Sequence, residues 1–314
     1  MSEVSYKEIS FEEEGQRLDN YLIRILKGVP KSHIYKIIRG GEVRINKKRS
    51  QVNSRLRTGD IVRIPPVRIS DSQEIFVGYA LAKGLKECII FEDSCLLVIN
   101  KPAGIAVHGG SGLSFGVIEA LRKTRQDLPY LELVHRLDKE TSGCLLLAKK
   151  RSTLRAIQAL LEAREIQKTY WALLTHPWEG KKKVTVRAAL EKNILKSGER
   201  MVSVNEAGKA SETDFKLLEN YKQACWIEAC PKTGRTHQIR VHSAHLGHVI
   251  VGDEKYGSVE GEVEGIDNYR NRLYLHARAI QFELNGIKQS FQANLDEQFA
   301  NTLKQLRAEE HSEQ

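Results

Sequence analysis

A nine-residue polar block between two apolar runs constrains this chain more than any other stretch. Residues 135–143 read His-Arg-Leu-Asp-Lys-Glu-Thr-Ser-Gly and separate residues 131–134 from residues 144–148. Both flanking runs are short and rich in Leu or Val, which is typical of buried strands. The pattern predicts strand, polar turn, strand, with Asp138 at the end of a sheet beside Arg136. For a lone Arg-x-Asp, a solvated ion pair on a surface turn would be the better explanation. The length of the polar block between two apolar strands favours a functional site.

Length and composition indicate a globular protein of about two domains. The chain has 314 residues, and no apolar run approaches the roughly 18 to 20 residues of a membrane helix. Residues 1–15 are acidic and lack the apolar core of a signal peptide. The five cysteines are scattered and form no C-x-x-C pair, so we expect reduced thiols and no zinc site. These features predict a cytoplasmic protein without a membrane partner.

Positive charge is concentrated near the N-terminus. Residues 15–68 contain 14 Lys or Arg against three Asp or Glu, whereas the formal net charge of the whole chain is +9. A dense positive field on one small module is the electrostatic footprint expected for a polyanionic partner.

The same module has a clear pattern of elements. Apolar spacing predicts a helix over residues 17–26 and a second helix over residues 32–38 with Ser32 as its N-cap. Residues 42–46 and 61–64 alternate as strands, with residues 47–49 as a turn. Arg-Leu-Asp in the first helix, Lys-Ser at the second and Gly-Asp before the last strand resemble the S4 RNA-binding domain. The resemblance implies RNA contacts by Lys31, Lys36, Arg39, Lys47, Lys48 and Arg49, although a charged solvated helix face is the alternative.

Strands dominate the rest of the chain. We expect a linker over residues 69–87 and a catalytic domain over residues 88–308, after the S4-like domain of residues 15–68. Short connections between strands favour an α+β fold with a mixed, mainly antiparallel sheet and flanking helices. A glycine-rich stretch at residues 108–112 lacks the spacing of a phosphate-binding loop, so we interpret it as a flexible lip at a site.

Three features could carry chemistry: Asp138, Tyr170 and the pair Arg235 and Arg240. A carboxylate near an arginine stays ionised, which suits a nucleophile better than a general acid. No second carboxylate accompanies Asp138, so a glycosidase that needs two is poorly supported. Histidines at 237, 242, 245 and 248 suggest a metal, but their helical spacing does not bring them to one face.

Four motifs in order resemble the pseudouridine synthases of the RluA family. They are Asn100-Lys-Pro-x-Gly104, His135-Arg-Leu-Asp-x-x-Thr-Ser-Gly143, Lys168-x-Tyr170 and Gly234-Arg-Thr-His-Gln-Ile-Arg-Val-His242. Together with the S4-like module, the resemblance covers almost the whole chain. One departure is Val249, where many relatives are expected to have Pro; it should alter a turn and leave the chemistry unchanged.

The family resemblance implies a role for each motif. Asp138 would be the nucleophile or would stabilise a glycal-type intermediate, and Tyr170 would stack on the uracil. Arg240 would pair with Asp138, and Arg136 would fill the space left by a flipped-out uridine. The remaining implied residues are His135 and Arg235 as RNA contacts, with Ile239 and Lys101 in the pocket. No cofactor and no metal are implied.

The resulting hypothesis is a monomeric isomerase of uridines in large-subunit (23S) ribosomal RNA. A catalytically inactive S4-type RNA-binding or ribosome assembly factor is the first alternative. A metal-dependent hydrolase built on the histidines is the second.

Overall fold

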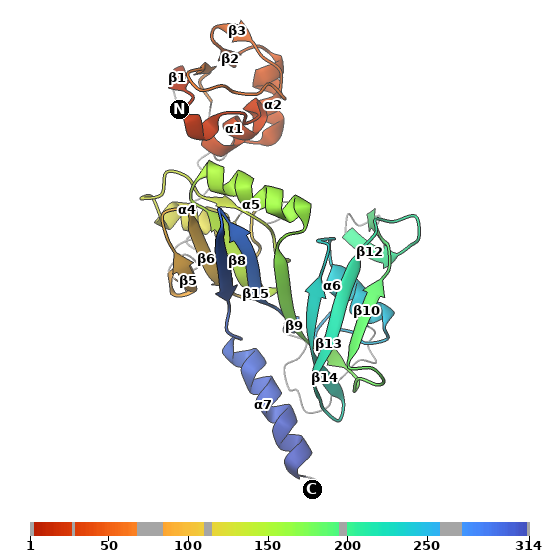
Figure 1. Cartoon of the computed structure of the whole chain (residues 1–314). Helices are drawn as coiled ribbons and strands as arrows, with labels where there is room; N and C mark the ends of the chain where they lie inside the picture. The colour runs from red at the N-terminus through yellow and green to blue at the C-terminus, as the bar shows by residue number, and fades with distance from the viewer. Residues whose placement is uncertain are drawn as a thin grey trace. The chain divides into compact units, whose positions relative to one another are not determined.

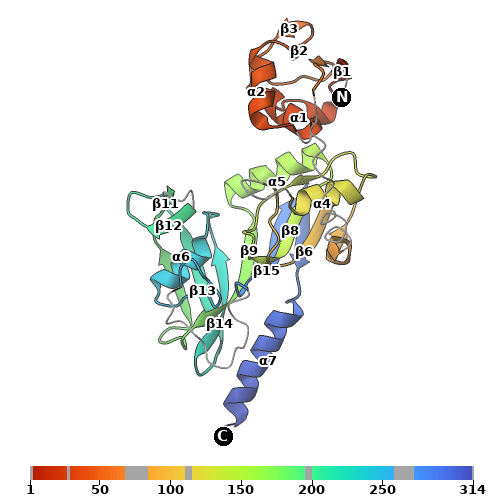
Figure 2. The same cartoon turned by 180° about the vertical axis from the view of Figure 1, so that it is seen from behind.

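The computed structural model describes residues 3–26, 29–67, 84–109, 115–194, 200–257 and 272–312. The chain forms two compact units, Met1–Gly78 and Tyr79–Gln314, and Figures 1 and 2 show their elements from opposite sides. Most of the predicted linker and residues 110–112 of the glycine-rich stretch lie outside the described residues. The domain limits 15–68, 69–87 and 88–308 therefore stay predictions.

The first unit is a pair of helices with a four-stranded sheet in the order β1-β4-β2-β3. Apolar residues at helical spacing, including Leu18, Leu22, Ile34 and Ile38, are buried together with Val62 of the sheet. The elements are β1 (Ser5–Glu8), the 3₁₀ helix η1 (Phe11–Glu13), α1 (Leu18–Ile25), α2 (Lys31–Arg39), β2 (Arg44–Ile45), β3 (Lys48–Arg49) and β4 (Ile61–Ile64). The predicted pair of helices on a small sheet is therefore confirmed.

Three details of this unit differ from the sequence-based expectation. Ser32 lies inside α2, whose N-cap is Pro30, because the helix begins at Lys31. The turn of the basic stretch is tighter than predicted: Asn46 and Lys47 adopt φ of 50° and 66°, and the chain returns as β3. Such left-handed pairs form two-residue hairpin turns. Strand β1 was not predicted, since its exposed residues show little hydrophobic alternation.

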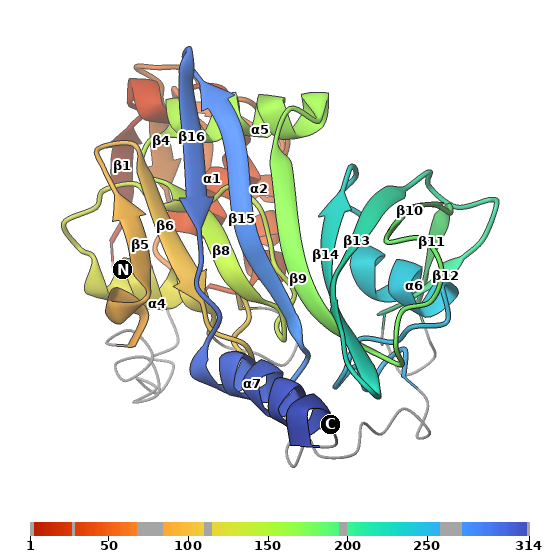
Figure 3. The same cartoon turned by 60° about the horizontal axis from the view of Figure 1, so that its bottom comes forward.

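The second unit is built on a ten-stranded sheet in the order β10-β13-β14-β9-β15-β8-β6-β5, with β16 beside β15 and β7 beside β8. Figure 3 shows β15, β9, β14 and β13 side by side. Only the β15–β8 pairing is parallel among the pairings described, so the sheet is mixed and mainly antiparallel, as predicted. The strands are β5 (Ile89–Glu92), β6 (Leu96–Lys101), β7 (Glu132–Leu133), β8 (Ser142–Ala148), β9 (Gln167–Thr175), β10 (Lys183–Arg187), β13 (Glu212–Asn220), β14 (Ala224–Pro231), β15 (Leu275–Leu284) and β16 (Ile287–Gln292).

Helices and a separate hairpin complete this unit. The helices are α4 (Val117–Thr124), α5 (Arg151–Ala163), α6 (Gln238–His245) and α7 (Glu297–Ser312), and the hairpin is β11 (Leu190–Ile194) with β12 (Arg200–Val204). Alternate residues of β6 enter two clusters: Leu97 packs in the cluster with α4, and Val98 in the cluster with α5. Because side chains alternate between the faces of a strand, α4 packs against one face of β6 and α5 against the other.

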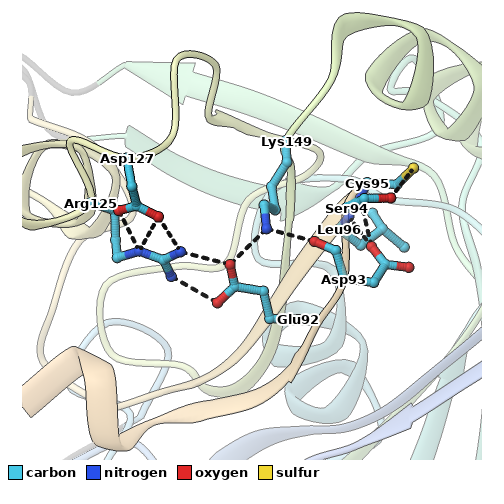
Figure 4. Close-up of polar contacts among 8 residues, drawn as sticks. All are labelled: Glu92, Asp93, Ser94, Cys95, Leu96, Arg125, Asp127 and Lys149. Atoms are coloured by element: carbon cyan, nitrogen blue, oxygen red, sulfur yellow. Dashed lines mark hydrogen bonds and ion pairs between the residues drawn. The ribbon is translucent and has the colours of Figure 1, made fainter.

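An ionic cluster joins three elements beside the sheet (Figure 4). Arg125, at the end of α4, binds the Glu92 carboxylate through two hydrogen bonds of 2.7 Å and also contacts Asp127. Lys149, which follows β8, donates to Glu92 at 2.7 Å. These hydrogen bonds, chiefly those from Arg125, lower the pKa of Glu92 to about 2. The cluster therefore ties α4 to β5 and β8.

Candidate active site

The polar block forms the loop between two paired strands, as the sequence predicted. Residues of β7 pair antiparallel with β8, and Asp138 lies in the loop that joins them. The loop is closed by a hydrogen bond from the Thr141 amide to the Asp138 carbonyl at 3.2 Å. Gly143 follows with φ of 109°, and a Cβ atom there would lie 2.3 Å from the carbonyl oxygen of Ala277. Only glycine allows β8 and β15 to approach this closely.

Lys101 supports this loop. It is fully buried, and its Nζ donates to the carbonyl oxygens of Pro102, Ile105 and Lys139 at 2.7, 2.8 and 3.0 Å. Burial lowers the pKa of Lys101 to about 7. The side chain does not belong to the cavity lining described below, so its predicted place in the pocket is corrected. Lys101 fixes the backbone beside Asp138.

A cavity of about 420 Å³ brings together segments that are far apart in the sequence. The β7–β8 loop, β9 and the stretch from Pro231 to Arg240 all contribute to its wall. Seven predicted site residues line it: His135, Arg136, Asp138, Tyr170, Arg235, Ile239 and Arg240. The three motifs thus meet at one place, around the Asp138 carboxylate.

Tyr170 lies on β9 between β14 and β15, where it is opposite Ala229 and Ala277. Burial, together with the negative charge of Asp138, raises the pKa of Tyr170 well above its usual value. The phenol is therefore neutral at physiological pH. It can stack through its ring or donate through its hydroxyl.

His135 is held by the sheet. Its Nε2 accepts a hydrogen bond from the Leu146 amide at 3.2 Å. Burial, with a smaller effect from the positive charge of Lys168, lowers the pKa of His135 to about 4. The ring is neutral, so it adds no positive charge to an RNA contact. Arg136, in contrast, is exposed at the cavity.

Arg240 has a partner other than the predicted one. Its Nε and Nη2 donate to Asp253 Oδ2 and Oδ1 at 2.7 and 2.6 Å, and the Asp253 side chain is completely buried. The expected Arg240–Asp138 ion pair is therefore wrong as a direct contact in this structure, although both side chains line the cavity. A buried carboxylate needs a bonded cation, and Asp253 takes Arg240 for this purpose.

His237 is the side chain that faces Asp138. Its Nε2 lies 3.8 Å from Asp138 Oδ2, and its Nδ1 lies 2.7 Å from the hydroxyl of Tyr256. Tyr256 also packs its ring against the Arg240 guanidinium, 5.0 Å from the ring centroid. Asp253 and Tyr256 thus hold two of the groups around Asp138. Neither was identified from the sequence, and the pattern Gly252-Asp-x-x-Tyr-Gly257 is the signal that could have indicated them.

The other histidines do not form a metal site. His242 is buried among Ser211, Thr213 and the Ala188 carbonyl, and His248 stacks on Trp178. In the described part of the chain, no three His, Cys, Asp or Glu side chains are grouped closely enough to bind a metal ion. This geometry gives no support to a metal-dependent hydrolase.

A second carboxylate, Glu162 of α5, also lines the cavity and was not anticipated. Its residue is exposed to solvent, whereas the general acid of a glycosidase is normally held in an apolar pocket. Glu162 therefore gives no support to a glycosidase mechanism with two carboxyl groups.

The basic residues of the first unit are available to a partner. All six predicted RNA contacts are exposed, from α2 and from the β2–β3 hairpin: Lys31, Lys36, Arg39, Lys47, Lys48 and Arg49.

Known proteins share both units. The RNA pseudouridylate synthase family matches residues 95–245, and the S4 domain matches residues 16–62. Relatives similar over nearly the full length carry the same activity in their names. The chain therefore belongs to the RNA pseudouridylate synthases, with an S4 domain at its N-terminus. The family resemblance noted from the motifs is confirmed.

Particular relatives are close. The ribosomal large subunit pseudouridine synthase C of Haemophilus influenzae is 52% identical over 310 residues, which is 98% of this chain and 96% of that protein. The protein of the same name from Escherichia coli K12 is 50% identical over 95% of each chain. One similar solved structure is titled Human RNA Pseudouridylate Synthase Domain Containing 4. The match covers 74% of this chain and 97% of that chain, with 28% sequence identity and a TM-score of 0.62. Among the helices described, none is both long and apolar enough to cross a membrane.

Proposed function

We propose that this protein converts specific uridines of large-subunit (23S) ribosomal RNA to pseudouridine, with Asp138 as the nucleophile. The observation that carries the proposal is the convergence of Asp138, Tyr170 and Arg240 on one cavity, in a chain about half identical to synthases named for the large ribosomal subunit. The exposed basic residues of the S4 domain supply the positive charge that holds an RNA backbone.

The reaction breaks the C1′–N1 glycosidic bond and joins C5 of the uracil to C1′. C5 loses a proton and N1 gains one, so atoms balance without a redox partner. Attack by the Asp138 carboxylate, either on the sugar or on the base, would start the sequence. Tyr170 offers a neutral ring on which the uracil can stack while it turns. Arg136, exposed at the cavity, can enter the RNA stack after the uridine leaves it.

Replacement of the carboxylate tests the proposal. Asp138→Asn and Asp138→Ala should lower the rate of pseudouridine formation on a large-subunit transcript by at least about 10⁴-fold. Asp127→Asn is the matched control, because Asp127 is an exposed carboxylate outside the cavity lining. Pseudouridine is mapped site by site after single turnover.

Two outcomes would contradict the proposal. If Asp138→Asn still forms pseudouridine at the wild-type rate, Asp138 is not the nucleophile. Absence of product from the wild-type protein, with equal RNA retention by wild type and variant, would favour the inactive RNA-binding factor instead.

A further inference from the structure

The neighbourhood of Asp138 contains a group that the nucleophile assignment does not use. Arg240 is bonded to Asp253, and His237 lies beside the Asp138 carboxylate, at 3.8 Å from Nε2 to Oδ2. This distance is too long for a hydrogen bond. Catalytic hydrogen bonds are often long in empty sites and shorten when substrate binds. His237 is therefore placed to bond Asp138 after a small movement.

The backbone at His237 favours a specific role for its ring. His237 is the N-cap of α6 and adopts φ of 53°, in the left-handed region that residues other than glycine rarely occupy. Its side chain is only 12% exposed and lines the cavity. Strained conformations of this kind cluster at functional sites. A turn required only for its shape would be served better by Gly or Asn.

The hydrogen bonds of Tyr256 favour one tautomer of the His237 ring. The Val202 amide donates to the Tyr256 hydroxyl oxygen at 3.1 Å, so that oxygen acts as an acceptor there. The same hydroxyl lies 2.7 Å from His237 Nδ1, and Nδ1 can accept the hydroxyl proton of Tyr256. Burial raises the pKa of Tyr256 to about 12, so the phenol retains this proton.

With Nδ1 as the acceptor of the Tyr256 hydroxyl, a neutral imidazole carries its proton on Nε2. Burial lowers the pKa of His237, which disfavours a second proton on the ring. A neutral imidazole that accepts at Nδ1 must donate at Nε2. The Nε2–H faces Asp138, and the ring has no free nitrogen with which to remove a proton from the uracil.

We infer that His237 is a positioning residue for Asp138: with its tautomer set by Tyr256, it donates from Nε2 to the carboxylate and orients it toward the flipped uridine. The inference rests on the proposed function, in which Asp138 is the nucleophile. Tyr256 acts one step further away, through His237.

Three substitutions separate this role from a structural one. His237→Asn suits the left-handed N-cap, but its amide reaches only as far as Nδ1 and leaves Asp138 without a donor. His237→Gln has an amide N–H at the reach of Nε2. Tyr256→Phe keeps the ring and removes the hydroxyl proton. His245→Asn is the matched control, because His245 is an exposed residue of the same helix and does not line the cavity.

The expected result is a selective loss of turnover. His237→Asn should lower kcat about 10- to 100-fold, the effect of a lost hydrogen bond to a charged group, with KM and RNA affinity nearly unchanged. His237→Gln should recover to within about fivefold of wild type, and Tyr256→Phe should lose about 3- to 10-fold. If His237→Asn and the control both keep wild-type kcat, or if Gln is no better than Asn, the inference is overturned.

A measurement independent of activity tests the tautomer. Two-bond ¹H–¹⁵N correlation spectra of the histidine-labelled protein at pH 7 should show the His237 ring, identified as the signal absent from His237→Gln, protonated on Nε2 only. Tyr256→Phe should convert it to a mixture of tautomers. Protonation on Nδ1 in the wild-type protein would overturn the inference. Failure of the wild-type protein to form pseudouridine would instead overturn the proposed function and leave the tautomer result standing.

Discussion

The Arg240–Asp253 pair allows a quantitative prediction about stability. Two hydrogen bonds of 2.7 and 2.6 Å join side chains that are 10% and 0% exposed. Removal of one partner of such a pair costs about 3 to 5 kcal/mol, because the other charge stays buried without compensation. Asp253→Asn and Arg240→Met should therefore each lower the free energy of unfolding by about 3 kcal/mol. For a unit of this size, that lowers Tm by about 6 to 12 °C.

The double variant Arg240→Met/Asp253→Asn should lose about as much stability as one single variant, not the sum of both. It contains no unpaired charge, and the Asn oxygen can still accept from the amides of Lys255 and Tyr256, which bond Asp253 at 3.0 Å. A coupling of about 3 kcal/mol is expected between these neighbours.

Tryptophan fluorescence in urea measures this cycle directly, because all three tryptophans of the chain lie in the second unit, at positions 171, 178 and 226. Additive losses in the double variant would refute the reasoning. The same protein also tests catalysis. A double variant that is as stable as the single variants but forms no pseudouridine would support a role for Arg240 beyond folding, and one that forms pseudouridine at the wild-type rate would contradict it.

Three further predictions concern other parts of the chain. Gly143→Ala should destabilise the second unit by about 2 to 3 kcal/mol or prevent folding, because its Cβ would overlap the Ala277 carbonyl. Gly180→Ala is the control in denaturation assays, since its φ of 81° is also left-handed but its Cβ meets nothing within 4 Å, so about 1 kcal/mol is expected. Glu92 has a lowered pKa of about 2, so its bond to Arg125 stabilises the protein above about pH 4.5 and is lost as the pH falls toward 2. The advantage of wild type over Glu92→Gln, at most about 1 kcal/mol for this partly solvated group, should vanish over that range in urea melts, and a constant difference would contradict the assignment. Neutralising the exposed S4 cations should reduce the slope of log Kd against log salt by about 0.7 to 0.9 for each phosphate that is no longer neutralised, and an unchanged slope would argue against RNA contacts by Lys31, Lys36, Arg39, Lys47, Lys48 and Arg49.

Local patterns predicted the elements, and contacts across space were harder to predict. Two apolar runs around a polar block predict the β7–β8 hairpin. The helical spacing of apolar residues, which are buried in the structure, predicts α1. Strand β1 gave no comparable signal, because most of its side chains are exposed; it pairs with β4. Lys101 lies in an apolar strand pattern, but nothing local shows that three backbone carbonyls would surround its ammonium group.

The site itself was predictable in its parts and not in its pairings. The family resemblance makes Asp138 the expected partner of Arg240, since both lie in its motifs. The Arg240 guanidinium instead bonds Asp253, a residue outside all four motifs, and sequence spacing alone does not reveal this partner. The choice depends on burial: Asp253 is completely enclosed and must be neutralised, whereas Asp138 is 24% exposed and keeps contact with water.

The turn that contains Asp253 and Tyr256 positions two of the side chains that line the cavity. It binds Arg240 through a carboxylate and His237 through a hydroxyl, so two groups at the cavity depend on one short segment outside all four motifs. Arg235 lies inside a motif and lines the same cavity, but among the described residues its guanidinium donates only to the Ala210 carbonyl, at 3.3 Å. A substitution in the turn should therefore disturb the geometry around Asp138 more than one at Arg235, which should act mainly on RNA affinity.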